Sequence, residues 1–219
     1  MPSAALQTIA VIDFETTGIA PGQGARATEI AAVLVCGGRI VDRYASLMHS
    51  GAWVSPFIEQ LTGISNAMLQ DAPPAAQVMR EVCRFTQGLP LVAHNAAFDR
   101  GFWQAEVQRA GLAADPAHEF ACTVLLSRRL YPRASNHRLG TLAVLHQLPA
   151  SGRAHRALAD AEVTAHLLLQ IQHDVSERFG EELGVQKVDH GLLMALQRGD
   201  ARALERCVAR YGRAEATAP

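Results

Sequence analysis

Short runs of apolar residues alternate along the chain with segments whose apolar positions recur at helical spacing. The run at 9–12 is short, continuous and rich in β-branched residues, so it predicts a buried central strand. Segments 29–35 and 39–48, joined by a pair of glycines, predict an antiparallel hairpin. A further apolar run at 91–93 predicts a second buried strand. This mixture of strands and helical segments is typical of the α/β class.

Helical spacing appears between and after the predicted strands, and a short strand is expected near Phe120. The last of these helices is strongly apolar, which indicates a deeply buried element. The expected helices are 75–86, a helix carrying Phe102, Val107 and Ala110, then 123–130, 139–146 and a helix carrying residues 158–169.

Composition limits the classes of function. The chain has 219 residues and 49% hydrophobic content, which suits one core of ordinary size plus an extension. No apolar run reaches the roughly 18 residues of a membrane span, and the first residues lack the charged start of a signal peptide, so we expect a cytoplasmic protein without a membrane partner. The four cysteines have no metal-ligand spacing and predict reduced thiols. A net charge of −1 argues against a broad cationic surface for long duplexes.

The first candidate chemical group directly follows the strand at 9–12. Asp13 and Glu15 are two positions apart, and side chains at i and i+2 of a strand point to the same face. The two carboxylates are therefore expected side by side, with Phe14 on the opposite face. Gly18 then allows the chain to turn close to a ligand.

Two later segments carry similar chemistry. Asp99 follows the strand at 91–93 and is expected at a strand-to-helix junction. His155 precedes Asp160 by five positions, an offset that does not place two side chains on one face of a helix. We therefore expect His155 in the loop or first turn, reaching inward from there.

These residue types are the ones that phosphodiester hydrolysis with two divalent metal ions requires. One ion activates water, a second holds the departing oxygen, and both favour hard oxygen ligands. Mg²⁺ or Mn²⁺ is the expected metal, because these cations prefer carboxylates to sulfur. The candidate metal ligands are Asp13, Glu15, Asp99 and Asp160.

Taken in order, the segments IDFETTG, HNAAFD and HRALAD resemble the three motifs of the DnaQ-like 3'-5' exonucleases over residues 7–175. The histidine at 155 resembles the DEDDh branch, because the sister branch has tyrosine where Arg156 stands. The family includes the proofreading exonuclease subunit of bacterial DNA polymerase III. The resemblance implies an RNase H-like fold, in which helices flank a mixed five-stranded sheet.

The resemblance also implies roles for the motif residues. Asp13, Glu15 and Asp160 would hold the metal that carries the attacking water, with Asp13 bridging to the second metal. Asp99 would act largely through metal-bound waters. His155 would be the general base, since imidazole titrates nearest to neutral pH.

Residues beside the motifs are candidates for holding the terminal nucleotide. Phe98 either stacks beside a base or packs under its helix. Arginines near the last motif either line a phosphate track or are scattered surface charge: Arg128, Arg129, Arg133, Arg138, Arg153 and Arg156. The substrate-binding candidates are Phe14, Thr16, Thr17, Gly18, His94, Asn95 and Phe98.

Three functions compete. The first is a metal-dependent 3'-5' exonuclease that releases 5'-mononucleotides from single-stranded DNA, in proofreading or repair. The second is an exoribonuclease of the RNase T or oligoribonuclease type, because the motifs do not include the sugar contacts. The third is a polymerase-docking module with little activity, against which the complete motif set argues. TTG after Glu15 resembles the DNA-acting members and favours DNA.

The resemblance divides the chain into an exonuclease domain at 1–175 and a helical hairpin with a tail at 176–219. Helices are expected at 188–196 and 201–211, with Gly199 ending the first and Asp200 capping the second. This extension either covers the domain core or serves homodimerisation or docking on a polymerase.

Overall fold

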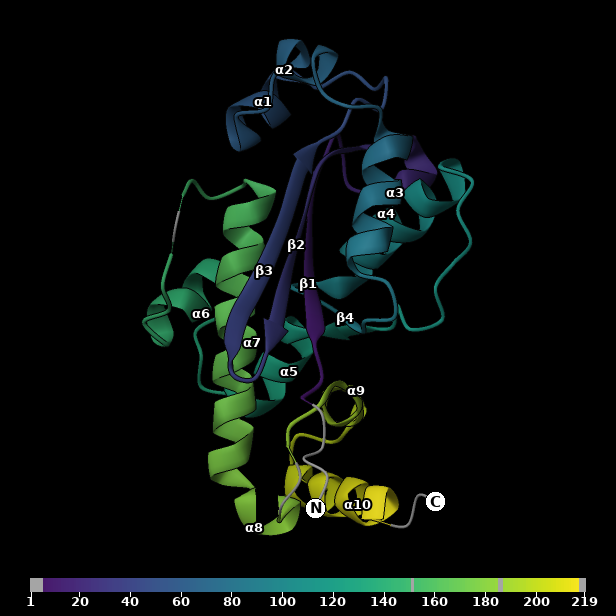
Figure 1. Cartoon of the computed structure of the whole chain (residues 1–219). Coiled ribbons are helices and arrows are strands. Elements are labelled where there is room, and N and C mark those ends of the chain that lie inside the picture. Colours follow the sequence, from purple (N-terminus) through teal and green to yellow (C-terminus); the bar gives the residue numbers. More distant parts are fainter. Residues whose placement is uncertain (1–5, 151, 185–186, 217–219) are drawn as a thin grey trace.

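A computed structural model of the chain describes residues 6–150, 152–184 and 187–216. Its centre is a five-stranded sheet in the order β3-β2-β1-β4-β5 (Figure 1). Strands β1 to β3 are antiparallel neighbours, whereas β4 and β5 run parallel to β1. The strands are β1 (Ile9–Thr16), β2 (Ala27–Cys36), β3 (Arg39–Leu47), β4 (Leu91–Ala93) and β5 (Phe120–Cys122). The predicted mixed five-stranded sheet is confirmed.

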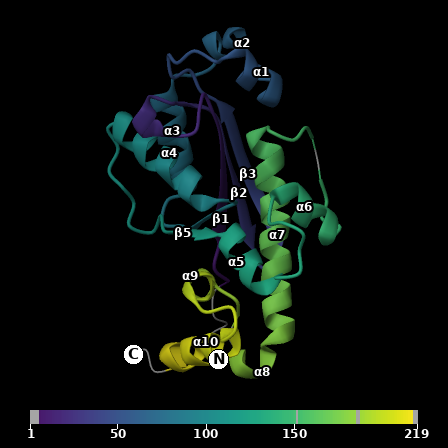
Figure 2. The ribbon, with the colours of Figure 1, turned by 180° about the vertical axis from the view of Figure 1, so that it is seen from behind.

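Helices flank this sheet on both faces, as the resemblance implied (Figure 2). The helices that the sequence predicted within 75–169 are present, with boundaries shifted by a few residues. In chain order the helices are η1 (Pro21–Gln23), α1 (Pro56–Thr62), α2 (Asn66–Gln70), α3 (Ala75–Phe85), α4 (Ala96–Arg109), α5 (Thr123–Leu130), α6 (Leu139–Leu145), α7 (Ala157–Arg178), α8 (Gly180–Leu183), α9 (His190–Arg198) and α10 (Leu204–Ala216).

The central strand β1 divides the interior into two apolar clusters. Ile12 faces a cluster that includes Met79 of α3 and Phe102 of α4. Val11 faces the opposite cluster, which includes Leu168 of α7. Strand alternation therefore assigns odd positions of β1 to the α7 face and even positions to the α4 face.

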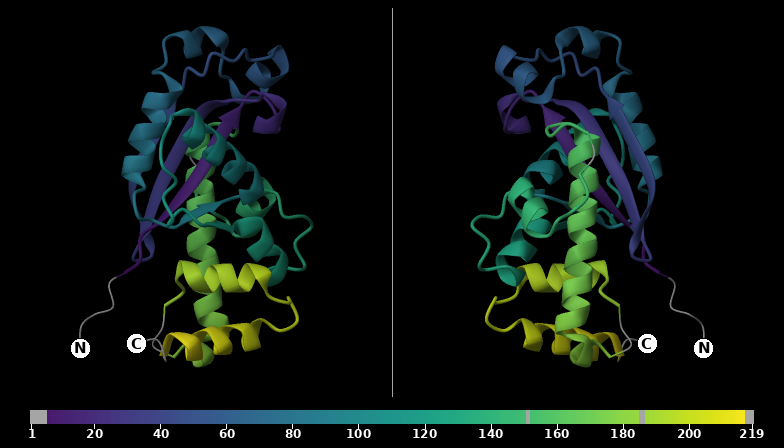
Figure 3. Two further views of the ribbon diagram at one scale, coloured as in Figure 1. Left: turned by 90° about the vertical axis from the view of Figure 1, so that its right-hand side faces the viewer. Right: turned by 90° about the vertical axis from the view of Figure 1, so that its left-hand side faces the viewer.

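The C-terminal helices pack on the α7 side of the core rather than standing apart (Figure 3). Helix α7 continues through the expected division at residue 175 and ends at Arg178. The helices predicted at 188–196 and 201–211 are present as α9 and α10, each beginning a few residues later than predicted. Gly199 follows α9 as predicted, but Asp200 caps a short turn before α10 by accepting from the Arg202 N–H at 2.9 Å.

The sequence predicted that the chain ends in a tail without helical structure, and part of this prediction is wrong. Residues 212–216 continue helix α10, and 217–219 lie outside the described residues. Within the part of the chain that the structure describes, every helix is too short or too polar to cross a lipid bilayer.

Helix α9 closes the exposed side of β5, which is the edge strand of the sheet. The Cys122 N–H donates to Gln197 Oε1 at 2.6 Å, and His190 Nε2 lies 3.0 Å from the Leu91 carbonyl oxygen. An unpaired edge strand invites wrong pairing, and Gln197 supplies β5 with a bond that a neighbouring strand would otherwise make, while His190 joins α9 to the adjacent strand β4. The extension therefore contributes to the fold of the main domain.

Gln197→Leu is expected to lower the free energy of unfolding by about 1–3 kcal/mol, because the buried Cys122 N–H would lose its acceptor. Urea denaturation measures this difference. Gln108→Leu, on the exposed face of α4, is the control and should change the value by no more than about 0.5 kcal/mol. Equal stability of the two variants would contradict the edge-covering role.

Candidate active site

Asp13 and Glu15 project from the end of β1 towards the α7 face. Phe14, between them, is buried on the other face, where its ring lies 6.4 Å from Phe102 and 6.5 Å from Trp103 between centroids. The register of β1 shifts after Glu15, where the pairing with β2 has a bulge. Such bulges re-aim side chains at the end of a strand. The alternation expected from the sequence thus sets both carboxylates on one face.

Asp99 reaches this end of β1 from the first turn of α4. The turn into α4 is made by Asn95, which has a positive φ of 66°. Asp99 is 1% exposed, and its Oδ1 accepts from the Phe14 N–H at 3.2 Å. This bond ties the first turn of α4 directly to the backbone between Asp13 and Glu15.

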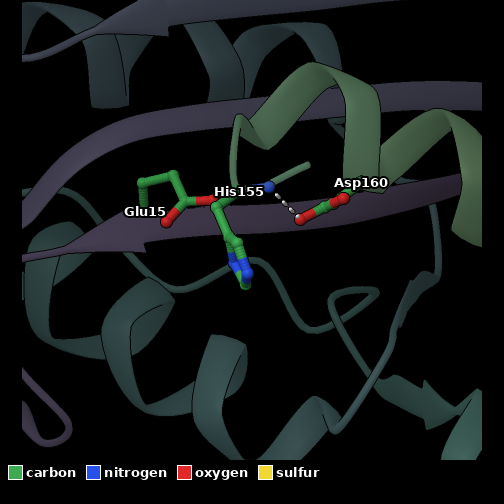
Figure 4. A group of neighbouring side chains, drawn as sticks. All are labelled: Glu15, His155 and Asp160. Carbon is green, nitrogen blue, oxygen red and sulfur yellow. Dashed lines mark hydrogen bonds between the residues drawn. The ribbon is translucent and has the colours of Figure 1, made fainter. Parts of the chain in front are cut away.

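The third segment enters from the start of α7. His155 lies in the loop before the helix, with a φ of 61°, and its N–H donates to Asp160 Oδ2 at 3.1 Å. Figure 4 shows His155 between Glu15 and Asp160, with its imidazole projecting from between the two carboxylates. One potential ligand atom from each of these three residues lies within 4.8 Å of the others. Residues 140 positions apart therefore share one small volume at the end of β1.

Burial and mutual repulsion raise the pKa of these carboxyl groups. Burial is the largest cause for Asp13, followed by the charges of Asp99, Glu15 and Asp160. Burial raises the pKa of Glu15 to about 8, with the negative charges of Asp160 and Glu29 adding to the effect. Burial also raises the pKa of Asp99 to about 8. Like charges this close are stable together only when protonated or when balanced by cations.

The donor set fits divalent cations of the Mg²⁺ or Mn²⁺ type. Glu15, Asp160 and His155 offer carboxylate oxygens and one imidazole within reach of one ion. Asp13 and Asp99 add negative charge beside them. Among the described residues, this group is the one that combines metal ligands at such short separation.

An ion pair that the sequence did not reveal lies next to Glu15. Glu29 of β2 is paired in register with Glu15 of β1. Its carboxylate accepts from Arg156 Nη2 at 2.7 Å, from Arg156 Nε at 3.0 Å and from the Ala157 N–H at 3.0 Å. Glu29 was missed because its partner lies 127 positions away and no local pattern marks it. A glutamate inside an otherwise apolar strand was the available signal.

Three of the six arginines near the last motif are held by internal contacts. Arg153 Nη2 donates to the Gln60 carbonyl at the end of α1 at 3.0 Å, and Arg129 Nε donates to the Gly199 carbonyl at 2.8 Å. With Arg156 held by Glu29, these three side chains serve the fold. They favour the second alternative, in which the arginines are not a phosphate track.

The candidates after the first motif mostly shape the turn. Thr16 Oγ1 donates to the Gly18 carbonyl at 2.7 Å, and Thr17 Oγ1 accepts from the Arg26 N–H at 3.0 Å. Thr16 is buried, while Thr17 and Gly18 are half-buried beside the carboxylates. The Phe14 side chain is packed in the core, so only its backbone faces the site.

The candidates of the second motif lie at the start of α4. Asn95 is exposed and His94 is half-buried, with Nδ1 2.8 Å from Thr123 Oγ1. Burial lowers the pKa of His94 to about 4, so its imidazole is neutral at pH 7. Phe98 is half-buried and its ring lies 4.9 Å from that of Phe102. The Phe98 ring therefore packs under its helix and keeps one part accessible.

Known proteins share this arrangement. The family model described as Exonuclease (RNase_T) matches residues 10–168. The 3'-5' exonuclease DinG of Bacillus subtilis is 40% identical over 165 residues, which cover 75% of this chain and 18% of that protein. The DNA polymerase III PolC-type of the same organism is 37% identical over 172 residues, covering 78% of this chain and 12% of that protein. The chain thus spans less than a fifth of these curated relatives.

Solved structures of other exonucleases are also similar to this chain. Exonuclease X, in complex with 5' overhanging duplex DNA, is 32% identical with a TM-score of 0.61, and the match covers 75% of this chain and 91% of that one. The nuclease domain of 3'hExo, a DEDDh family member bound to rAMP, is 20% identical with a TM-score of 0.68, covering 78% of this chain and 94% of that one. The second likeness concerns the fold alone.

The raised pKa values predict how stability depends on pH without metal. A carboxyl group whose folded pKa exceeds its unfolded pKa stabilises the protein fully below the unfolded value, and this contribution is lost as pH rises through about 8. The Tm of metal-free protein should therefore fall between pH 5 and pH 8, and Mg²⁺ should restore it at pH 8.

Asp13→Asn removes one of the repelling charges. It should raise the Tm of metal-free protein at pH 8 by a few degrees, about 2–4 °C for each kcal/mol recovered, and weaken the effect of Mg²⁺. Differential scanning calorimetry in a chelating buffer measures both. The same pH slope in Asp13→Asn and wild type would show that the cluster does not carry this repulsion.

Proposed function

The chain belongs to the exonuclease family, and we propose that it is of the DEDDh type and hydrolyses nucleic-acid single strands from the 3' end. The products would be 5'-mononucleotides, and DNA would be preferred to RNA. The observation that supports this most strongly is the convergence of Glu15, His155 and Asp160 beside Asp13 and Asp99.

Each residue would have one task. Two divalent cations, Mg²⁺ or Mn²⁺, held by Asp13, Glu15, Asp99 and Asp160, would supply an activated water and charge neutralisation at the phosphate. His155 would accept the proton from the attacking water. Its imidazole is exposed and its backbone is held by Asp160, so it is accessible to substrate while its position is fixed.

The terminal nucleotide would lie between the first two motifs. Gly18 and the backbone from Phe14 to Thr17 belong to the end of β1 that carries Asp13 and Glu15, and Asn95 and Phe98 stand at the start of α4, which carries Asp99. The accessible part of Phe98 would pack beside the terminal base or sugar. The His94 imidazole would help to orient the terminal nucleotide as a neutral hydrogen-bond donor or acceptor, because burial lowers its pKa.

DNA is favoured by the sequence TTG after Glu15, and among the relatives by a solved complex of Exonuclease X with DNA. An exoribonuclease is the second candidate, because a structure with the same fold is bound to rAMP. The same fold therefore accommodates both sugars in other proteins, and the choice in this chain depends on groups around the terminal ribose.

A polymerase context is supported by the PolC-type relatives, in which the matching segment is a small part of a longer protein. We propose proofreading or repair as the setting. Residues 1–175 would carry the activity. Residues 176–219 would mainly cover the sheet edge, because Leu192 and Leu196 of α9 are fully buried in the core. Homodimerisation or docking on a polymerase is their alternative role.

Asp160→Ala should abolish nucleotide release, because it removes a metal ligand and the acceptor of the His155 N–H. Steady-state release of mononucleotides with Mg²⁺ measures this. The control is Glu177→Ala, which changes an exposed carboxylate on the same helix. Activity in folded Asp160→Ala at the level of Glu177→Ala would contradict the assignment.

His155→Ala should reduce kcat by about 10²–10⁴, the usual contribution of a general base. Its matched control is His173→Ala, an exposed histidine further along α7. A kcat within about twofold of wild type would make His155 a structural residue.

The sugar preference is tested with DNA and RNA single strands of one sequence at equal concentration. DNA should be degraded faster under single-turnover conditions with Mg²⁺. Faster loss of RNA would select the exoribonuclease instead.

A further inference from the structure

We propose that Glu29 and Arg156 form a positioning pair that sets His155 and Asp160 against Glu15. The proposal rests on the proposed function of this site. Glu29 lies outside the three motif segments. Arg156 lies within the third segment but is not one of the five candidate catalytic residues, and neither side chain would touch the reacting atoms.

The contacts of Glu29 show how the start of α7 is fixed. Its carboxylate receives two donors from the Arg156 guanidinium, at 2.7 and 3.0 Å, and the Ala157 N–H at 3.0 Å. Ala157 is the first residue of α7, whose terminal N–H groups have no acceptor within the helix. Glu29 is 5% exposed, so these bonds form largely away from water. One strand side chain thus caps the helix and pairs its arginine.

Arg156 is linked to both motif residues of the loop. It directly follows His155, and its carbonyl accepts from the Asp160 N–H at 3.1 Å. The His155 N–H in turn donates to the Asp160 side chain at 3.1 Å. A shift of Arg156 would therefore move the His155 backbone and the Asp160 carboxylate together.

The pair lies on the same face of the sheet as Glu15. Glu29 and Glu15 are directly opposed partners on β2 and β1, so their side chains point to one face, and Arg156 is bound to Glu29 there. Arg156 is 35% exposed at its side chain, whereas Glu29 is 6% exposed, so the pair is shielded from one side only.

The chain offers a matched control on the same helix. Arg43 of β3 forms an ion pair with Glu162 of α7, so it also joins the sheet to this helix. Arg43 makes no contact with the site residues in the bonds that the structure describes. Arg43→Gln should therefore report the loss of a sheet-to-α7 ion pair without loss of positioning.

Three variants test the proposal: Arg156→Gln, Glu29→Gln and the double variant. In each, kcat on a DNA single strand should fall about 10–100-fold, as for other residues that orient metal ligands, while KM stays within about threefold. The kcat of the double variant should be no lower than that of the less active single variant, because the two side chains act as one unit. Arg43→Gln should keep wild-type kcat.

Two readouts do not depend on activity. Calorimetric titration should show Mn²⁺ affinity reduced about 10–100-fold in Arg156→Gln. Hydrogen exchange of metal-free protein should be faster across residues 152–160 in Arg156→Gln and unchanged there in Arg43→Gln. If Arg156→Gln does not fold, Arg156→Lys replaces it; lysine keeps the charge but cannot make the paired bonds, so faster exchange across 152–160 is still expected.

Wild-type exchange across 152–160 together with wild-type Mn²⁺ affinity in the folded variants would overturn the proposal. If wild-type protein has no nuclease activity, exchange and Mn²⁺ binding still decide the positioning role. If wild type is active and the variants match it, the pair has no positioning role while the proposed function stands.

Discussion

The structure depends on the burial of several carboxylates at the end of one strand. Asp13 and Glu15 leave β1 on the same face, and Asp99 and Asp160 are added from two helices. Burial raises the pKa of all four carboxyl groups, and for Asp13 and Glu15 the charges of the neighbouring carboxylates add to the rise. Such an arrangement is stable with protons or cations and unfavourable without them. The architecture around it is best understood as a frame that holds these groups together against that repulsion.

The frame is centred on β2 and its first residues. On one face, Arg26 immediately before β2 makes two bonds to the buried Glu106 of α4, at 2.8 and 2.9 Å, and α4 carries Asp99. On the other face, Glu29 holds the start of α7, which carries Asp160. Two ion pairs of the same kind thus fix two helices to one strand from opposite sides. Each pair joins a largely buried glutamate to a partly exposed arginine, so the cost of desolvation offsets much of the attraction.

Local rules of the sequence predicted much of this site. Strand alternation placed Asp13 and Glu15 on one face, and helical periodicity excluded His155 from the face of Asp160. Glu29 was not predicted, because its importance arises from the register between β1 and β2 and from a partner far along the chain. The full length of α7 was also not predicted: the helix continues through residue 175 to Arg178, and apolar spacing alone does not fix the last residue of a helix.

The central claim is that this cluster removes nucleotides from the 3' end with the help of divalent cations. Its most direct test is digestion of a DNA single strand that carries a label at its 5' end, followed over time with Mg²⁺ and with a chelator. The account predicts a ladder of labelled products that shorten stepwise in Mg²⁺ and an intact strand in the chelator. Immediate release of a labelled mononucleotide, or equal digestion in the chelator, would contradict it.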